Sequence, residues 1–597
     1  MDHLSLDTMR HSTAHLFAAA VTELYPDAKL GVGPVLENGF YYDVLTKEPI
    51  AQESLKKIEQ RMREIRNRGV AFTREEMPID AAITFFRERG QDFKVELLTD
   101  LKTRGTTKIK GEEAQDVDAE KPSIASVYHT GTFVDLCRGP HVENTKQIGA
   151  FKLTKIAGAY WRGSEKNPML TRIYGLAFAT QAEIDAHLLM LAEAERRDHR
   201  KLGTELDLFA FSPLVGSGLP LFTPRGALLR RLLEEFVLSL QTQYGYQRVW
   251  IPHITKAELY KTSGHWDKFE DDLFHVSSKK SDEQFVLKPM NCPHHTQIFA
   301  SRPRSYRDLP LRYAEVTTVY RDENTGQLQG LSCVRSITQD DAHIFCTMEQ
   351  AKAEMRNVYK VILGFYKAFG MSLRVRLSVR DPEHPEKYLG GDEAWNGAET
   401  ALKDLLAEEK LDYSLGLGEA AFYGPKLDFI AKDAIGREWQ LATIQLDFNQ
   451  PERFGLAYMD SDGQEKRPVM IHRAILGSIE RFLGILIEHY AGVFPTWLAP
   501  VQVAVIPVGE KYLRRCAKLA KTIAAADIRV EVDTANESVG YKIRRAEKMK
   551  VPYMLVIGDK EAKSTALMVR LRGQKDVKKM AMSTFLKRVG TENAKRK

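Results

Sequence analysis

Between residues 204 and 498, strand-like segments follow one another with little helix between them. The strand patterns are FVLKPM, LRYAEVTTVYRDE, SCVRSITQDDAHIFC, LRVRLSV and WQLATIQLDF. Parallel neighbours need a long crossover, usually a helix, whereas antiparallel neighbours need only a turn. We therefore expect this region to form an antiparallel sheet rather than a doubly wound one.

The strand and helix patterns before residue 204 and after residue 498 differ from the pattern between them. The chain of 597 residues is therefore expected to divide into several α+β and α/β domains. Residues 1–178 mix strands and helices, and residues 100–121 have the composition of a surface excursion. Residues 179–203 have a highly charged helical pattern, which we interpret as a linker helix that ends at Gly203. The segment 204–498 closes on an apolar helical pattern, AILGSIERFLGILIEHY. Residues 499–597 alternate strand and helix, which predicts a small α/β domain with a largely parallel sheet.

Charge is unevenly distributed along the chain. From Val501 onward there are 23 Lys and Arg against 10 Asp and Glu, a net charge of +13, whereas the whole chain carries +6. The rest is therefore acidic, at −7. A basic module of this kind is typical of proteins that bind a polyanion such as nucleic acid, although a solvated lysine-rich surface has the same composition.

Composition excludes collagen-like proteins, low-complexity disordered proteins and small disulfide-rich proteins. With 43% hydrophobic and 28% charged residues, the chain has globular composition. No apolar run approaches the roughly 18–20 residues of a membrane span, so no membrane partner is expected. The N-terminus lacks the pattern of a secretory signal, and five cysteines in so long a chain suggest a reducing compartment. We therefore expect a cytoplasmic protein.

No phosphate-binding loop of the form G-x-x-x-x-G-K-[ST] is present, and a weak dinucleotide match at residues 416–421 lacks its preceding strand. A bound nucleotide would therefore need arginines. Three spaced motifs offer them: GYQRVWIP at 245–252, YRDE at 320–323, and GSIERF at 477–482, the last inside the apolar helical pattern. Together and in this order they resemble motifs 1, 2 and 3 of the class II aminoacyl-tRNA synthetases.

Longer strings sharpen the resemblance. MNCPHH at 290–295, TQDDAHIFC at 338–346, AFYGPK at 421–426, QLDF at 445–448 and MIHRAILGS at 470–478 are similar to the threonyl-tRNA synthetase family. HSTAHL at 11–16 and VDLCRGPH at 134–141 resemble its editing domain. The resemblance implies an editing domain at 1–178, the linker helix, a catalytic domain at 204–498 with the class II antiparallel sheet, and an anticodon-binding domain at 499–597. Many family members begin with a small ubiquitin-like module, which this chain is expected to lack.

The resemblance implies that the protein uses ATP with Mg²⁺ to attach L-threonine to tRNA(Thr) through a threonyl-adenylate. A guanidinium is always charged and donates in a fixed fork, which suits phosphate. By family analogy Arg321 contacts the α-phosphate, Arg481 the γ-phosphate and Glu323 the adenine amine. Further active-site residues implied by the matched strings are Lys426, Gln339, Asp341, Tyr423, Gln440, Gln445 and Ser478. Pro252 belongs to the motif that the family uses at its dimer interface, so a homodimer is expected.

Three residues fall on the family's zinc-ligand positions: Cys292, His343 and His472. They are far apart in sequence and form no short zinc signature, so the resemblance alone implies one Zn²⁺ per subunit. One thiolate and two imidazoles suit zinc and leave a position open for substrate. His294 and His295 are interpreted as bystanders. Because valine lacks the threonine hydroxyl, such a site would reject it by a factor on the order of 10⁴, whereas serine, lacking only a methyl, needs a second site.

That second site is implied at the N-terminus. His11 and His15 stand one helical turn apart, and Cys137-x-x-x-His141 adds a thiol and another imidazole. Read alone, these residues are a reasonable second zinc site. The resemblance favours a metal-free site, in which they and Asp135 orient a water that hydrolyses seryl-tRNA(Thr). Tyr128 lies near a matched position.

In the basic module the resemblance places four residues on positions that read anticodon bases: Asn536, Arg544, Glu561 and Arg570. Lys542, Arg545, Lys548 and Lys550 are expected to face phosphate or solvent. One departure from the family stands in motif 2, where Cys333 occupies a position that commonly carries arginine, beside an unusual Ser332, while Arg335 is retained.

Two other functions remain open. One is a synthetase-like protein that binds RNA without aminoacylating it, although a degenerate relative would be expected to have lost some motif arginines or zinc ligands. The other is a free-standing zinc hydrolase built on residues 1–175, which leaves the three arginine motifs unexplained.

Overall fold

The computed structural model describes residues 3–105, 107, 123–574 and 576–597. These form two compact units, Met1–Ala192 and Glu193–Lys597. Most of the surface excursion expected at 100–121 lies outside the described residues, and its first residues belong to helix α4 (Asp92–Arg104). Within the described part of the chain, no helix is long and apolar enough to cross a membrane.

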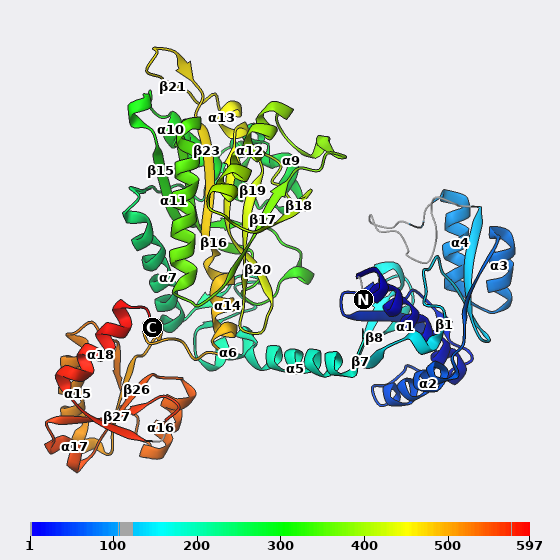
Figure 1. Cartoon of the computed structure of the whole chain (residues 1–597). Coiled ribbons are helices and arrows are strands. Elements are labelled where there is room, and N and C mark those ends of the chain that lie inside the picture. Colours follow the sequence, from blue (N-terminus) through cyan, green and yellow to red (C-terminus); the bar gives the residue numbers. More distant parts are fainter. Residues whose placement is uncertain (1–2, 106, 108–122, 575) are drawn as a thin grey trace. The chain divides into compact units, whose positions relative to one another are not determined.

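The first unit contains a five-stranded antiparallel sheet with helices α1 (His3–Leu24) and α2 (Ser54–Arg68) packed together and against it (Figure 1). Its strands are β1 (Lys29–Leu30), β2 (Val35–Leu36), β3 (Gly39–Leu45), β7 (Ala150–Tyr160) and β8 (Met169–Phe178). Helix α2 buries Leu55, Ile58, Met62 and Ile65, a spacing that places them on one face. Gly69 ends α2 in the left-handed conformation, at φ +70°.

A second, smaller layer in this unit is a three-stranded antiparallel sheet of β4 (Phe72–Pro78), β5 (Ile124–Thr130) and β6 (Phe133–Leu136). Helices α3 (Ile79–Glu88) and α4 pack together beside it (Figure 1). The β5–β6 hairpin agrees with the mixture of strands and helices expected for residues 1–178. The hairpin brings Asp135 and Cys137, at the end of β6, back toward α1.

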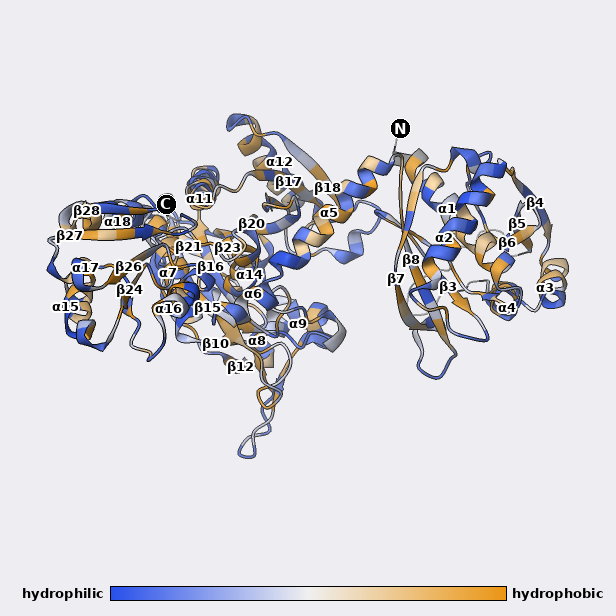
Figure 2. Cartoon of the chain, turned by 90° about the horizontal axis from the view of Figure 1, so that it is seen from below, coloured by the Kyte–Doolittle hydropathy of each residue, from blue (hydrophilic) through white to orange (hydrophobic). Residues whose placement is uncertain are grey.

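The predicted linker helix is two helices, α5 (Gln181–Arg197) and α6 (His199–Glu205). Asp198 interrupts them, and its side chain accepts a hydrogen bond from the Arg200 backbone at the start of α6. The prediction that the helix ends at Gly203 is wrong. Gly203 lies buried inside α6, where a Cβ would stand 2.2 Å from the Phe209 ring. Figure 2 shows both hydrophobic and hydrophilic residues along α5, and Leu189 is 72% exposed.

An eight-stranded sheet forms the centre of the second unit, in the order β11-β15-β16-β23-β20-β19-β17-β18. These strands are β11 (Gln247–Arg248), β15 (Leu311–Tyr320), β16 (Ser336–Cys346), β17 (Leu373–Val379), β18 (Tyr413–Leu417), β19 (Lys426–Lys432), β20 (Glu438–Asp447) and β23 (Val469–Ser478). All pairs except the two outermost are antiparallel, which confirms the predicted sheet type. The amphipathic helix α11 (Met348–Lys367) packs on β16, β20 and β23 and contacts α7 (Pro224–Thr242) (Figure 1).

The apolar stretch at 474–490, predicted to be one helix, changes structure at Ser478. Its first residues complete β23, and α14 (Ile479–His489) begins after them. A short apolar run does not by itself distinguish a buried strand from a helix. Gly477, at φ +73°, makes the turn, and Ser478 Oγ caps α14 by accepting from the Arg481 backbone. The first two residues of the GSIERF motif therefore lie outside the helix.

The C-terminal part has a mixed five-stranded sheet in the order β25-β24-β26-β27-β28. The strands are β24 (Val503–Pro507), β25 (Val530–Val532), β26 (Tyr553–Ile557), β27 (Ala566–Leu571) and β28 (Val577–Ala581), with helices α15 (Leu513–Ala524), α16 (Val539–Lys548), α17 (Asp559–Lys563) and α18 (Met582–Ala594). The first three strands are parallel, as predicted, but β27 and β28 are antiparallel. The link between β26 and β27 is too short for the crossover that a parallel pair requires.

Candidate active sites

The register of the central sheet lines up residues from four strands. His343 on β16 pairs with His472 on β23, which pairs with Gln445 on β20, which pairs with Lys426 on β19. Directly opposed residues point to the same face of a sheet. Cys292 joins this row at the first position of α10 (Cys292–Ala300), and the ligand atoms of Cys292, His343 and His472 lie within 4.8 Å of one another.

Hydrogen bonds orient both imidazoles of this Cys–His–His cluster. His472 Nε2 lies 2.7 Å from Asp447 Oδ2, which leaves Nδ1 for another partner. His343 Nδ1 lies 2.8 Å from His295 Nδ1, which leaves Nε2. Such outer contacts fix ring orientation at metal sites. His295, interpreted from the sequence as a bystander, therefore contacts a predicted ligand.

The electrostatics of the cluster suit a cation. Burial lowers the pKa of His343 well below its usual value, so the imidazole is neutral and able to ligate. Burial, with the charges of Asp341 and Asp447, raises the pKa of the Cys292 thiol. A thiolate here needs a positive neighbour, and a divalent ion would supply it. One thiol and two imidazoles match the donors that zinc prefers.

Polar side chains surround the cluster. Tyr423 packs its ring 5.0 Å from that of His472 and donates to Gln445 Oε1 at 2.6 Å. Asp341 accepts from Asn291 Nδ2 at 3.0 Å. Lys426, Gln440 and Ser378 all donate to one fully buried carboxylate, Asp428. Sequence reasoning missed Asp428, whose signal is only its place two residues after Lys426 on the same strand face.

Most of the other residues predicted for the active site line a cavity of 220 Å³. Its lining includes Arg321, Glu323, Gln339, Gln440, Ser478 and Arg481, together with Ser332 and Cys333. Arg321 also approaches the cluster side, since its Nη2 lies 3.1 Å from Met290 Sδ and its guanidinium 5.2 Å from the Phe269 ring. Among the described residues Arg321 Nε has no hydrogen-bond partner, and burial lowers its pKa. A buried, incompletely partnered guanidinium is suited to an anion.

Backbone contacts hold the motif 2 segment, residues 320–335, against α14. Arg481 Nε donates to the Ser332 carbonyl at 3.0 Å. Arg335, the retained arginine, donates to the Glu323 carbonyl from Nε and Nη2. Sequence reasoning missed Glu480, which accepts from the Thr338 backbone at 2.8 Å and pairs with Arg230, so it anchors α14 to β16 and α7.

The first unit holds a second cluster. His11 and His15 of α1 and Cys137 and His141 beyond β6 place their ligand atoms within 4.8 Å of one another. Cys137 Sγ lies 3.3 Å from both His11 Nε2 and His141 Nε2, and Ser12 Oγ lies 3.1 Å from His141 Nδ1. Burial lowers the pKa of His141 to about 2, so its ring is neutral. Tyr128 packs against His141, with ring centroids 4.4 Å apart.

Asp135 is not part of that four-residue cluster. It is buried and accepts from Lys94 Nζ at 3.0 Å, from the Leu136 backbone and from the Tyr42 hydroxyl. Lys94, on α4, is 1% exposed. Nothing in the sequence singles out this lysine, because α4 contains other charged residues at similar spacing.

The four predicted base-reading residues lie on α16, α17, β27 and the loop before α16. Asn536 and Arg544 are exposed, whereas Arg570 is half-buried and pairs with Glu547, and Glu561 accepts from the Gly558 backbone at the start of α17. Lys542, expected to face phosphate or solvent, is 5% exposed and directs its ammonium toward the Pro507 and Asp533 carbonyls.

Family comparisons match three parts of the chain. Residues 274–490 match the tRNA synthetase class II core domain (G, H, P, S and T), and residues 502–592 match an anticodon binding domain. Residues 125–174 match the threonyl and alanyl tRNA synthetase second additional domain.

Relatives that match nearly the whole chain are threonine–tRNA ligases. A threonine–tRNA ligase from Rubrobacter xylanophilus is 47% identical over 595 residues, covering 99% of this chain and 90% of that protein. One from Halalkalibacterium halodurans is 46% identical, covering 99% and 89%. The RNA-binding domain of threonyl-tRNA synthetase from Cryptosporidium parvum superposes with a TM-score of 0.63 at 36% identity, covering 66% of this chain and 98% of that one. The chain belongs to the threonine–tRNA ligase family, with a class II catalytic core, an anticodon-binding domain and an editing-related domain.

Proposed function

We propose that this chain activates L-threonine with ATP and Mg²⁺ and transfers it to tRNA(Thr). The observation that supports this most directly is the position of Arg321, which lines the 220 Å³ cavity and lies 3.1 Å from the sulfur of Met290, two residues before Cys292. ATP in the cavity would then present its α-phosphate to Arg321 and its γ-phosphate to Arg481, with Glu323 at the adenine. The threonine carboxylate attacks the α-phosphate and displaces pyrophosphate, while the guanidinium offsets the charge that develops there. A hydroxyl of the tRNA 3′ end then takes the threonyl group from the adenylate, and AMP leaves.

Amino-acid-dependent ATP–pyrophosphate exchange across all twenty amino acids tests this function. Threonine alone is expected to support strong exchange, with serine weak and valine negligible. A protein that binds RNA without aminoacylating, or a free-standing hydrolase, would exchange with none of them. Exchange led by another amino acid would refute the proposed substrate.

We propose that Cys292, His343 and His472 hold one Zn²⁺ per subunit. Zinc held there would act as a Lewis acid toward the threonine amino and hydroxyl groups, because three protein ligands leave the metal accessible to substrate. Asp447 and His295 hold the two imidazoles in place, and Asp341, Tyr423 and Gln445 line the same side. Valine would leave these polar groups unpaired, which is the basis for rejecting it. Zinc content of the purified protein, measured by mass spectrometry, tests the assignment: fewer than half a zinc per chain would refute it.

We propose that the histidine–cysteine cluster of the first unit removes serine from tRNA(Thr) without a bound metal. Neutral imidazoles held by Ser12 and Cys137 can accept a hydrogen bond from a water molecule and orient it toward the ester. Asp135 and Lys94, paired in the interior, hold β6 and α4 beside α1. Deacylation of supplied seryl-tRNA(Thr) in the presence of a chelator tests this, and loss of the activity with recovery on added zinc would make the site a metal site.

We propose that the protein acts as a cytoplasmic homodimer that binds the anticodon through residues 499–597. Asn536, Arg544, Glu561 and Arg570 would contact bases, while exposed lysines contact phosphate. The dimer surface would include Trp250, which is 76% exposed, and an adjoining cavity of 560 Å³ lined by Arg248 and Glu315. Glu315 Oε2 is buried there and has no partner within the described residues. Sedimentation velocity tests the dimer.

A further inference from the structure

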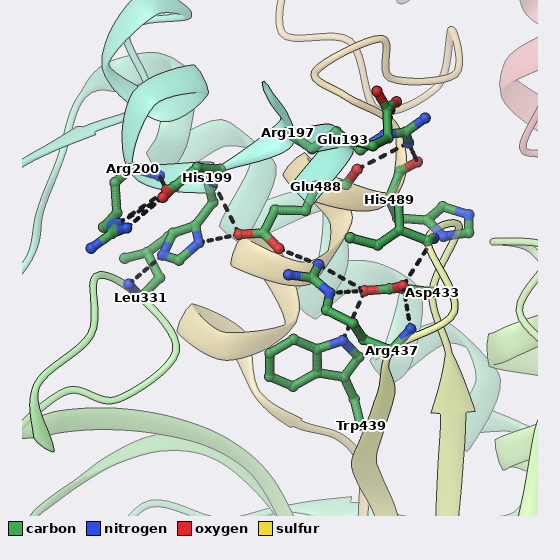
Figure 3. Close-up of polar contacts among 12 residues, drawn as sticks. Glu193, Arg197, His199, Arg200, Leu331, Asp433, Arg437, Trp439, Glu488 and His489 are labelled. Atoms are coloured by element: carbon green, nitrogen blue, oxygen red, sulfur yellow. Dashed lines mark hydrogen bonds and ion pairs between the residues drawn. The ribbon is translucent and has the colours of Figure 1, made fainter. Parts of the chain in front are cut away.

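A buried histidine links three segments of the second unit that are distant in sequence. His199, at the first position of α6, is 4% exposed. Its Nδ1 and its backbone N–H lie 2.6 and 3.1 Å from one oxygen of Glu488, in the last turn of α14. Its Nε2 lies 2.9 Å from the backbone N of Leu331, in the motif 2 segment (Figure 3).

The three contacts determine the state of the imidazole. A backbone amide only donates, so His199 Nε2 accepts and carries no proton. The proton is therefore on Nδ1, which donates to Glu488. Both ring nitrogens are used in this way, so His199, Glu488 and Asp198, although close enough to hold a metal, are already committed to hydrogen bonds.

Leu331 lies in a position that matters for the cavity. It is fully buried, and the next residue, Ser332, gives its carbonyl to Arg481 Nε. Arg481 and Glu488 are two turns apart on the same face of α14. The motif 2 segment is therefore held to α14 at two points, directly by Arg481 and indirectly through His199.

The backbone of Gly330 packs closely against the His199 ring. Gly330 adopts φ +53°, and a Cβ there would stand 2.3 Å from His199 Nε2. Glu488 is itself held on its other oxygen by Arg437, which also pairs with Asp433 (Figure 3). The end of α5 is fixed nearby, because Arg197 donates to the His489 carbonyl at 2.9 Å.

We propose that His199 is a positioning residue for the nucleotide site: by accepting from the Leu331 amide it fixes the Ser332 carbonyl, and through it Arg481, relative to Arg321. This rests on the proposed ATP-dependent function. The hydrogen bonds described for His199, Leu331 and Ser332 lead to Glu488 and Arg481 and not to the imidazoles of the Cys–His–His cluster, so we expect the effect to concern ATP rather than threonine.

Two substitutions separate the two ends of the imidazole. In His199→Asn the amide can replace Nδ1–H toward Glu488 but does not reach Leu331. In His199→Gln the longer side chain can place its oxygen near the position of Nε2 and accept from Leu331. Arg437→Gln is the matched control, because it weakens the same network without touching the motif 2 segment. Threonine-dependent exchange is measured for each, with KM for ATP and for threonine, alongside the thermal unfolding midpoint.

For His199→Asn we expect KM for ATP to rise about tenfold, the scale of one buried hydrogen bond left unmade, with KM for threonine unchanged. For His199→Gln we expect a KM for ATP close to that of the wild type. Arg437→Gln should lower the unfolding midpoint without changing KM for ATP. Equal losses in the Asn and Gln variants, or parallel changes in both KM values, would overturn the positioning role.

If His199→Asn does not fold, Gly330→Ala, which pushes a methyl group against Nε2, is expected to raise KM for ATP in the same way, and normal ATP kinetics in that variant would overturn the proposal. Wild-type protein without threonine-dependent exchange would refute the proposed function itself.

Discussion

Asp447→Asn changes which nitrogen of His472 carries the proton. Asp447 Oδ1 accepts from the backbone amides of Asn449 and Gln450, at 2.7 and 2.9 Å, and Oδ2 accepts from His472 Nε2 at 2.7 Å. In asparagine one carboxylate oxygen becomes a donor. Because two amides already donate to the Oδ1 position, the asparagine oxygen stays there and its NH₂ group faces His472. Nε2 must then accept, so the proton moves to Nδ1, the nitrogen that zinc requires.

The size of the effect follows from this exchange of roles. Loss of an outer-shell partner typically weakens metal binding by about 10- to 100-fold, or about 1.4 to 2.7 kcal/mol. We expect a result toward the upper end of this range, because the substitution also moves the proton to the nitrogen that zinc would use; the same inversion of tautomer is the cause of lost activity when the aspartate of a catalytic triad is replaced by asparagine. Exchange with threonine should fall in proportion to the zinc lost and should recover at high zinc concentration.

Competition with a chromogenic chelator measures the zinc affinity of each variant. Asp433→Asn is a matched control, since Asp433 is also buried and also accepts from two backbone amides, those of Ile435 and Arg437, but lies outside the cluster. It should leave zinc affinity unchanged. If Asp447→Asn binds zinc within twofold of wild type, the orienting role of Asp447 is refuted.

Arg321→Ala is expected to reduce threonine-dependent exchange by at least about 100-fold while tRNA affinity is kept, because its partner is ATP; weaker tRNA binding with normal exchange would reverse that assignment. His11→Ala combined with His15→Ala should leave threonine activation unchanged but allow seryl-tRNA(Thr) to accumulate in a charging assay with serine, and if none accumulates the editing site lies elsewhere. If the protein is the proposed homodimer, Trp250→Glu should convert it to monomers in sedimentation velocity, whereas a dimer with an unchanged sedimentation coefficient would place the interface on another surface. Arg570→Ala should lower charging of wild-type tRNA(Thr) with little effect on exchange; equal charging by the variant and the wild-type protein would show that the basic module does not read the anticodon through this residue.

Much of the central fold was predictable because its strands have strong patterns and short connections. The antiparallel sheet followed from that spacing alone. The strand-to-helix change at Ser478 did not, because the apolar residues at 474–476 fit both a buried strand and a helix, and only the positive φ of Gly477 separates the two. Gly203 was misread for a similar reason: a glycine near a helix end usually caps it, whereas here it makes room for Phe209.

The site residues divide in the same way. Residues in distinctive strings, such as Cys292 and His343, could be proposed from the sequence. Their supporting partners could not, because a hydrogen bond across a sheet depends on register, which the sequence does not display. A contact between a helix and a strand is equally hidden: Lys94 on α4 pairs with Asp135, 41 positions away, and is one of several charged residues on that helix.

The strand order of the central sheet also has a consequence for synthesis of the chain. β23 pairs on both sides, with β16 and with β20, yet it is the last of these strands to leave the ribosome. Until then β16 and β20 each have an unpaired edge, the kind of surface that joins to neighbouring chains. His472 lies on that same strand, so the proposed zinc site lacks one of its three ligands until β23 has been made. Polypeptides that end before β23 should therefore aggregate, and a full set of the three proposed ligands exists only in chains that include this strand.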